Sequence, residues 1–130
     1  MDATFARPWL RLEGLAAFAL ALALHWHWGL SWGWFAALFL VPDLSMLGYL
    51  AGPRVGAVAY NLAHSYVVAA LPLLAALAPG AGGAAADPRL LGAGLVWCAH
   101  IGFDRALGYG LKYASGFTDT HLGRIGKLPM

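Results

Sequence analysis

The sequence predicts an all-α protein: a bundle of four transmembrane helices with both termini in the cytoplasm and a short interfacial C-terminal tail. Three observations lead to this prediction. Of the 130 residues, 61% are hydrophobic and only 11% are charged, which is too apolar for a soluble domain of this size. Apolar runs of about 20 residues, enough for a helix to cross a bilayer, recur along the whole chain. Basic residues gather at alternate ends of these runs, as they do beside cytoplasmic loops.

The four crossings form one domain that covers residues 1–130, with helices expected at about 13–29, 31–50, 54–77 and 90–113. Four tryptophans between Trp26 and Trp34 surround the first turn, where amphipathic rings suit the membrane interface. The third connection is rich in glycine and proline, which predicts a surface loop. The tail, 114–130, is too polar to cross and is expected on the cytoplasmic interface.

The distribution of charge sets the orientation and excludes some classes of function. Seven basic residues fall on one predicted side and only Arg89 on the other, which places both termini in the cytoplasm of a bacterial cell. The net charge of +2 is dispersed, so there is no basic patch for nucleic acid. A single cysteine, Cys98, excludes an internal disulfide and offers no thiolate pair to a metal.

Ionisable residues lie near the middle of three crossings. Asp43, His64 and His100 belong to the second, third and fourth, and Asp104 follows His100 by one turn on the same face. At about 1.5 Å of rise per residue, Asp43 lies roughly 18 Å along its helix and each histidine roughly 15 Å along its own. Antiparallel neighbours therefore bring all of them to a similar depth. Because a charged group in hydrocarbon costs at least a few kcal/mol, such residues face the bundle interior and mark a functional site.

Neighbouring residues extend this polar layer. Asn61 shares a helix face with His64, and Pro42 should bend the second helix and free the carbonyl of Leu38. In the tail, Asp119 and His121 could fold back over the mouth of the bundle and complete a site with Asp104 and Glu13.

Two imidazoles and two carboxylates without thiolates suit zinc, manganese or iron, held in a helical bundle with one position open to water. Water bound there becomes acidic, and a spare carboxylate can serve as general base. The sequence thus predicts a hydrolase acting on an ester, amide or phosphate of a lipid or amphipathic substrate. The predicted catalytic residues are Asp43, Asp104 and Asn61. The predicted metal ligands are Asp43, His64, His100 and Asp104, with His121 and Asp119 as further candidates.

Three alternatives remain open from the sequence. Haem could use His64 and His100 as axial ligands, which would make the protein an electron-transfer module. A hydrogen-bonded network in which Asp104 pairs with Arg105 or Lys112, and each histidine pairs with a carboxylate, would make it a non-catalytic scaffold. Protons or ions could move along the ionisable residues, but four short helices would then need to form an oligomer.

Small residues recur every fourth position through the second turn and on the fourth helix, and they predict close helix contacts. A homodimer or higher oligomer could form through either set. The sets are Gly48, Gly52 and Gly56, and Gly102, Ala106 and Gly110.

Four blocks from the second helix onward resemble a known family. They read PDLSMLGY from Pro42, YNLAHSY from Tyr60, HIGFDRALGYGLKY from His100 and GFTDTHLG from Gly116. The chain is similar in these blocks to small bacterial integral membrane proteins catalogued only as a domain of unknown function. The resemblance implies a membrane location and a compact multi-helix domain, and it brings no reaction, substrate or cofactor.

Overall fold

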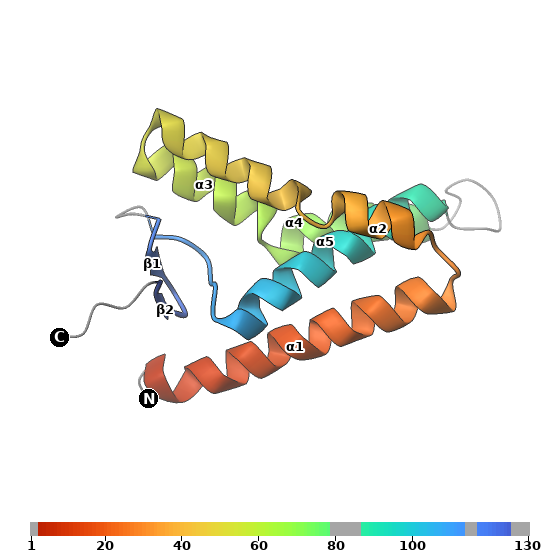
Figure 1. The fold of residues 1–130 in the computed structure, drawn as a ribbon, viewed down its shortest axis with the longest axis horizontal. Coiled ribbons are helices and arrows are strands. Elements are labelled where there is room, and N and C mark those ends of the chain that lie inside the picture. The colour runs from red at the N-terminus through yellow and green to blue at the C-terminus, as the bar shows by residue number, and fades with distance from the viewer. Residues whose placement is uncertain (1–2, 79–86, 114–116, 126–130) are drawn as a thin grey trace.

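The computed structural model describes residues 3–78, 87–113 and 117–125 (Figure 1). This part of the chain is helical apart from one short antiparallel strand pair, so the predicted all-α class is confirmed. The elements are α1 (Ala3–His27), α2 (Trp32–Leu38), the 3₁₀ helix η1 (Val41–Ala51), α3 (Pro53–Ala63), α4 (Tyr66–Leu77), α5 (Pro88–Leu107), β1 (Asp119–Thr120) and β2 (Gly123–Arg124).

The helices form four legs that alternate in direction (Figure 1). The legs are α1, then α2 with η1, then α3 with α4, then α5. Helix α5 packs against α1 on one side and α4 on the other, while η1 and α3 pack against each other. The start of α1 and the β1–β2 pair lie at one end of the molecule, and the α1–α2 turn lies at the other.

Two boundaries differ from the sequence prediction. The first helix begins at Ala3 rather than near residue 13, because the segment before the apolar run is also helical. The last helix ends at Leu107 rather than 113, because Gly108 adopts φ 93°, a left-handed conformation that closes a helix. Its backbone N–H donates to the Arg105 carbonyl at 3.0 Å.

The second and third legs are each broken in the middle. Helix α2 ends at Leu38 and η1 begins at Val41 with Pro42 in its first turn, where the sequence predicts a bend. Eleven residues of 3₁₀ helix is unusually long. Helix α3 ends at Ala63, and Ser65 caps α4 by accepting from the Val67 N–H at 3.3 Å. This second break was not predicted.

Many large apolar side chains are exposed, and several histidines are buried beside a core of smaller apolar residues. Leucines and valines of η1, α3 and α4 are exposed, Leu50 at 88% and Val67 at 76%. The largest fully buried side chains are Ile101, His25, His64 and His100. So much exposed apolar surface is unusual for a soluble protein. Two stretches, Trp32–Ala51 and Pro53–Leu77, are long and apolar enough to cross a membrane.

Glycines bring helices of the same chain into close contact. A Cβ on Gly102 would lie 2.6 Å from the Gly14 carbonyl oxygen of α1, and one on Gly48 would lie 2.9 Å from the Ala59 Cβ of α3. Gly52 has φ 116° and forms the turn between η1 and α3. These positions serve contacts and a turn within the chain, and association through them stays a prediction.

The described part of the C-terminal segment, residues 117–125, folds back against the helices. Lys112 forms an isolated bridge with Thr120, and Leu122 is buried. The Phe117 ring packs against Tyr49 of η1, with 5.4 Å between ring centroids.

Candidate metal centre

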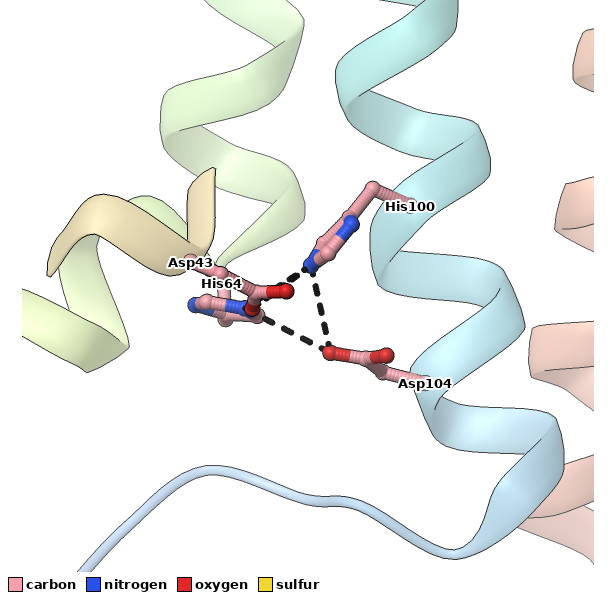
Figure 2. A group of neighbouring side chains, drawn as sticks. All are labelled: Asp43, His64, His100 and Asp104. Carbon is pink, nitrogen blue, oxygen red and sulfur yellow. Dashed lines mark hydrogen bonds and ion pairs between the residues drawn. The ribbon is translucent and has the colours of Figure 1, made fainter. Parts of the chain in front are cut away.

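Four ionisable side chains from three separate elements meet at one point (Figure 2). Asp43 comes from η1, His64 from the junction of α3 and α4, and His100 and Asp104 from adjacent turns of α5. The Nε2 atoms of His64 and His100 each lie 3.2 Å from Asp43 Oδ1, and they lie 3.4 and 3.3 Å from Asp104 Oδ2. The predicted convergence of these residues is therefore observed.

The spacing of the four atoms suits a small cation. The two Nε2 atoms lie 3.1 Å apart, and all four ligand atoms lie within 4.8 Å of one another. A tetrahedral metal with bonds of about 2.0 to 2.1 Å has ligands separated by about 3.3 Å. Five of the six separations are close to that value.

The tautomer of the His64 ring also suits a bound cation. Its Nδ1 lies 2.9 Å from the Tyr60 carbonyl oxygen, which can only accept, so Nδ1 carries the proton. In the neutral ring, Nε2 then carries a lone pair and no hydrogen, and it faces a second imidazole nitrogen and two carboxylate oxygens. A hydrogen bond that fixes the tautomer in this way is the usual outer support of a metal-bound histidine.

Hydrogen bonds from α5 stabilise the break between α3 and α4. The Trp97 indole N–H donates to the Ala63 carbonyl, and Arg105 Nη2 donates to the His64 carbonyl at 2.9 Å. These carbonyls would otherwise be left without partners where the helix ends. Helix α5 thus supplies two of the four side chains and also fixes the backbone that carries His64.

The four side chains differ in exposure. The exposed fraction is 0% for His64, 2% for His100 and 13% for Asp104, but 32% for Asp43. Asp43 therefore lies at the open side of the centre, and the other three side chains are more deeply buried.

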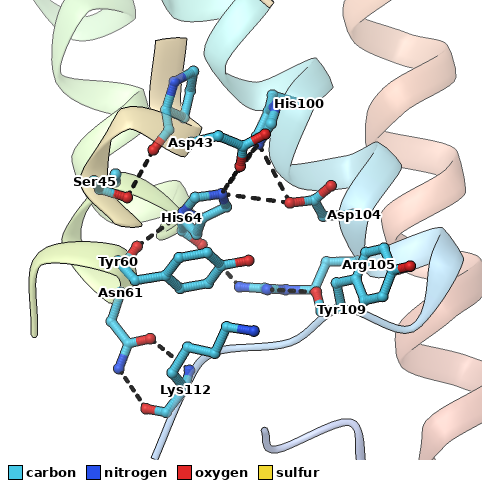
Figure 3. A network of polar contacts seen from close by, with 12 residues as sticks. Asp43, Ser45, Tyr60, Asn61, His64, His100, Asp104, Arg105, Tyr109 and Lys112 are labelled. Carbon is cyan, nitrogen blue, oxygen red and sulfur yellow. Dashed lines mark hydrogen bonds and ion pairs between the residues drawn. The ribbon is translucent and has the colours of Figure 1, made fainter. Parts of the chain in front are cut away.

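Other predicted site residues lie elsewhere. Both polar atoms of the Asn61 side chain bond the backbone of Lys112, with Nδ2 donating to its carbonyl at 2.8 Å and Oδ1 accepting from its N–H at 2.6 Å (Figure 3). His121 accepts from the Leu111 N–H through Nδ1 at 2.9 Å and is not in the four-residue group, and burial lowers its pKa. Glu13 is exposed on α1. The Asp119 side chain lies outside the described residues.

The comparisons with known proteins give a family. The profile of a domain of unknown function, DUF4260, matches residues 7–125. The chain belongs to the DUF4260 family. The resemblance found in the sequence blocks is thus confirmed. Neither the curated proteins nor the solved structures gave a match.

The sequence did not identify two residues beside the centre of this DUF4260 protein. The Tyr60 ring stacks on the His64 ring, with centroids 3.7 Å apart and an interplanar angle of 8°. The Lys112 ammonium lies over the rings of Tyr60 and Phe117, and burial lowers the pKa of Lys112 to about 8. Tyr60 lies one helical turn before His64, a spacing that could have pointed to it.

The predicted pairing of Asp104 with Arg105 or Lys112 is not found. Within the described ranges, the ion pairs of Asp104 are those with His64 and His100. Arg105 instead bonds the carbonyls of His64 and Tyr109.

Proposed function

We propose that this DUF4260 protein is an integral membrane metallohydrolase that acts on a lipid or amphipathic substrate. One observation carries the proposal: the Nε2 atoms of His64 and His100 lie 3.1 Å apart and both face two carboxylates, while the Tyr60 carbonyl holds the proton of His64 on Nδ1. Such a set of electron pairs is stabilised by a cation at its centre. Two imidazoles and two carboxylates suit zinc, manganese or iron.

The exposure of the four side chains divides their roles. His64, His100 and Asp104 would hold the metal, as three protein ligands do in catalytic zinc sites. A divalent metal there lowers the pKa of water enough to supply a nucleophile at neutral pH. Asp43, at the open side, would accept a proton from that water and deliver it to the leaving group as the scissile bond breaks.

The outward apolar surface supports insertion of all four legs in the bacterial cytoplasmic membrane. The exposed leucines and valines of η1, α3 and α4 meet lipid in this arrangement, while the His/Asp centre lies inside the bundle. The basic residues near the ends of the legs support an orientation with both termini in the cytoplasm.

The same geometry argues against haem. Two axial nitrogens on one iron stand about 4 Å apart with a porphyrin between them. The Nε2 atoms of His64 and His100 are closer than that, and the oxygens of Asp43 and Asp104 occupy the space around them.

Metal analysis of the protein purified in detergent tests the proposal. We expect one zinc, manganese or iron per chain in the wild type and none in His100→Ala. His27→Ala is the matched control, because His27 is exposed at the end of α1 and should keep the metal. A metal-free wild type after growth in supplemented medium, or a strong Soret absorption band, would overturn the proposal.

A further inference from the structure

Lys112 is a buried cation that has no anionic partner in the described part of the chain. It is 4% exposed, and its Nζ lies 3.8 Å from the centre of the Phe117 ring. The same atom lies 4.7 Å from the centre of the Tyr60 ring (Figure 3). No carboxylate among the described side chains, to which that of Asp119 does not belong, lies within 4.0 Å of it. Aromatic faces attract an ammonium, but they do not neutralise its charge.

The position of Lys112 relative to the centre is fixed from two sides. Asn61 clamps its backbone with two hydrogen bonds from α3, one turn before His64. Tyr60 contacts the Lys112 ammonium and also stacks on the His64 ring. The ammonium is close enough to Asp43 and Asp104 for both carboxylates to stabilise its charged form. A rigidly held charge beside a metal centre is suited to recognition rather than to solvation.

The balance of buried charge indicates what Lys112 would bind. The carboxylates of Asp43 and Asp104 are matched by Arg105 and Lys112, both of which are buried. A divalent metal then leaves an excess of two positive charges in a site of low dielectric constant. A phosphate monoester carries about two negative charges at neutral pH, and its oxygens can contact a metal and an ammonium at once. A carboxylate carries one negative charge and would balance only half of this excess.

We propose that Lys112 binds a phosphate oxygen of the substrate, and that the substrate is a phosphate monoester of an amphipathic alcohol. This inference rests on the proposed function and names its substrate class. In the reaction, the oxygen of water bonds to phosphorus and the bond from phosphorus to the alcohol oxygen breaks. The proton lost by water passes through Asp43 to the alcohol, which leaves with free phosphate as the second product.

Calorimetric titration of inorganic phosphate into the zinc-loaded protein in detergent tests the inference. We expect phosphate to bind the wild type, and Lys112→Met to weaken binding by at least about tenfold, as loss of a charged contact does. Lys112→Arg should keep most of the affinity. Arg54→Gln is the charge-matched control, because Arg54 is exposed at the start of α3 and should not alter binding.

Several results would overturn the inference. They are wild-type affinity in Lys112→Met, an affinity for acetate equal to that for phosphate, or a zinc-loaded wild type that binds no phosphate. In each of these cases the metal centre itself would survive, because zinc is bound. A wild type that takes up no metal would remove the proposed function and the inference together. If Lys112→Met does not fold, the ratio of phosphate to acetate affinity in the wild type and Lys112→Arg decides.

Discussion

Asp43 differs from the other members of the centre because its side chain reaches the surface. We predict that Asp43→Asn keeps the metal and that its turnover rate falls by a factor of about 10² to 10⁴, since the amide cannot accept a proton. Asp104→Asn, with the same change in a ligand that is more buried, should lose the metal itself. Metal content and hydrolysis of a chromogenic substrate in micelles distinguish the two. Equal loss of metal in both variants would indicate a closed structural site with four ligands.

Lys112 should make stability depend on pH. Burial lowers its pKa to about 8 from 10.5, so between these values the unfolded chain binds more protons and the folded state gains stability as pH rises. The charged groups that face Lys112 are Asp43 of η1 and Asp104 of α5, and Tyr60 of α3 contacts it. Lys112→Met, which carries no charge, should therefore be more stable than the wild type below pH 8.

Thermal unfolding of both proteins between pH 6 and 10.5 measures this effect. The advantage of Lys112→Met should be constant up to about pH 7 and should shrink as the pH approaches 10.5. A difference that is the same at every pH would mean that the pKa of Lys112 is close to its ordinary value.

The residues of the centre could be predicted from the sequence, but their supports could not. Asp43, His64, His100 and Asp104 stand out because each interrupts an apolar run. Lys112 does not, because it lies at the end of the fourth predicted crossing, where basic residues are common, and its position depends on Asn61, which is 51 residues away in the sequence. Contacts over such distances leave no local pattern.

At the scale of elements, the two breaks differ in how visible they are in the sequence. The break before η1 follows from Pro42, which lacks a backbone N–H. The break at His64 has a weaker local signal, Ser65, a residue type that favours the start of a helix. It depends on Trp97 and Arg105, which satisfy the carbonyls that it frees.

Removing one of these donors should destabilise the protein. We predict that Trp97→Phe lowers the free energy of unfolding by about 1 to 3 kcal/mol, because the buried Ala63 carbonyl loses its partner. Metal affinity should fall by about tenfold, as it does when an outer support is removed. Trp34→Phe is the matched control, because Trp34 is 67% exposed and the change should cost less than about 0.5 kcal/mol. Equal effects of the two variants on unfolding would contradict this role for Trp97.

The contact between α1 and α5 allows a second test within elements. An alanine at Gly102 would place its Cβ 2.7 Å from the backbone nitrogen of Phe18, so α1 and α5 would have to separate. We predict that Gly102→Ala destabilises the protein by at least about 1 kcal/mol. Gly92→Ala, on the same helix with nothing within 4 Å, should stabilise it by up to about 1 kcal/mol through helix propensity. Thermal unfolding in one detergent compares the pair, and a stable Gly102→Ala would show that the helices can separate easily.

For the whole molecule, hydropathy predicts four apolar helical segments, and two stretches of the structure, Trp32–Ala51 and Pro53–Leu77, are long and apolar enough to cross a membrane. Hydropathy could not give the fold of the C-terminal segment. The packing of Phe117 on Tyr49 and the bridge between Lys112 and Thr120 join residues that no periodicity relates. The same segment brings Phe117 to the Lys112 ammonium, so the part that the sequence described least contributes to the surroundings of the centre.

The alternation of the four legs predicts a topology that labelling can measure. In a Cys98→Ala background, which removes the single native thiol, one cysteine replaces His27 or Arg54. These exposed residues lie on either side of the stretch Trp32–Ala51. Because basic residues mark the cytoplasmic side, a maleimide that cannot cross membranes should label His27→Cys in intact bacteria and Arg54→Cys only after permeabilisation. Labelling of both in intact cells would mean that this stretch does not cross the membrane, and the His/Asp centre would then have to be explained without a surrounding bilayer.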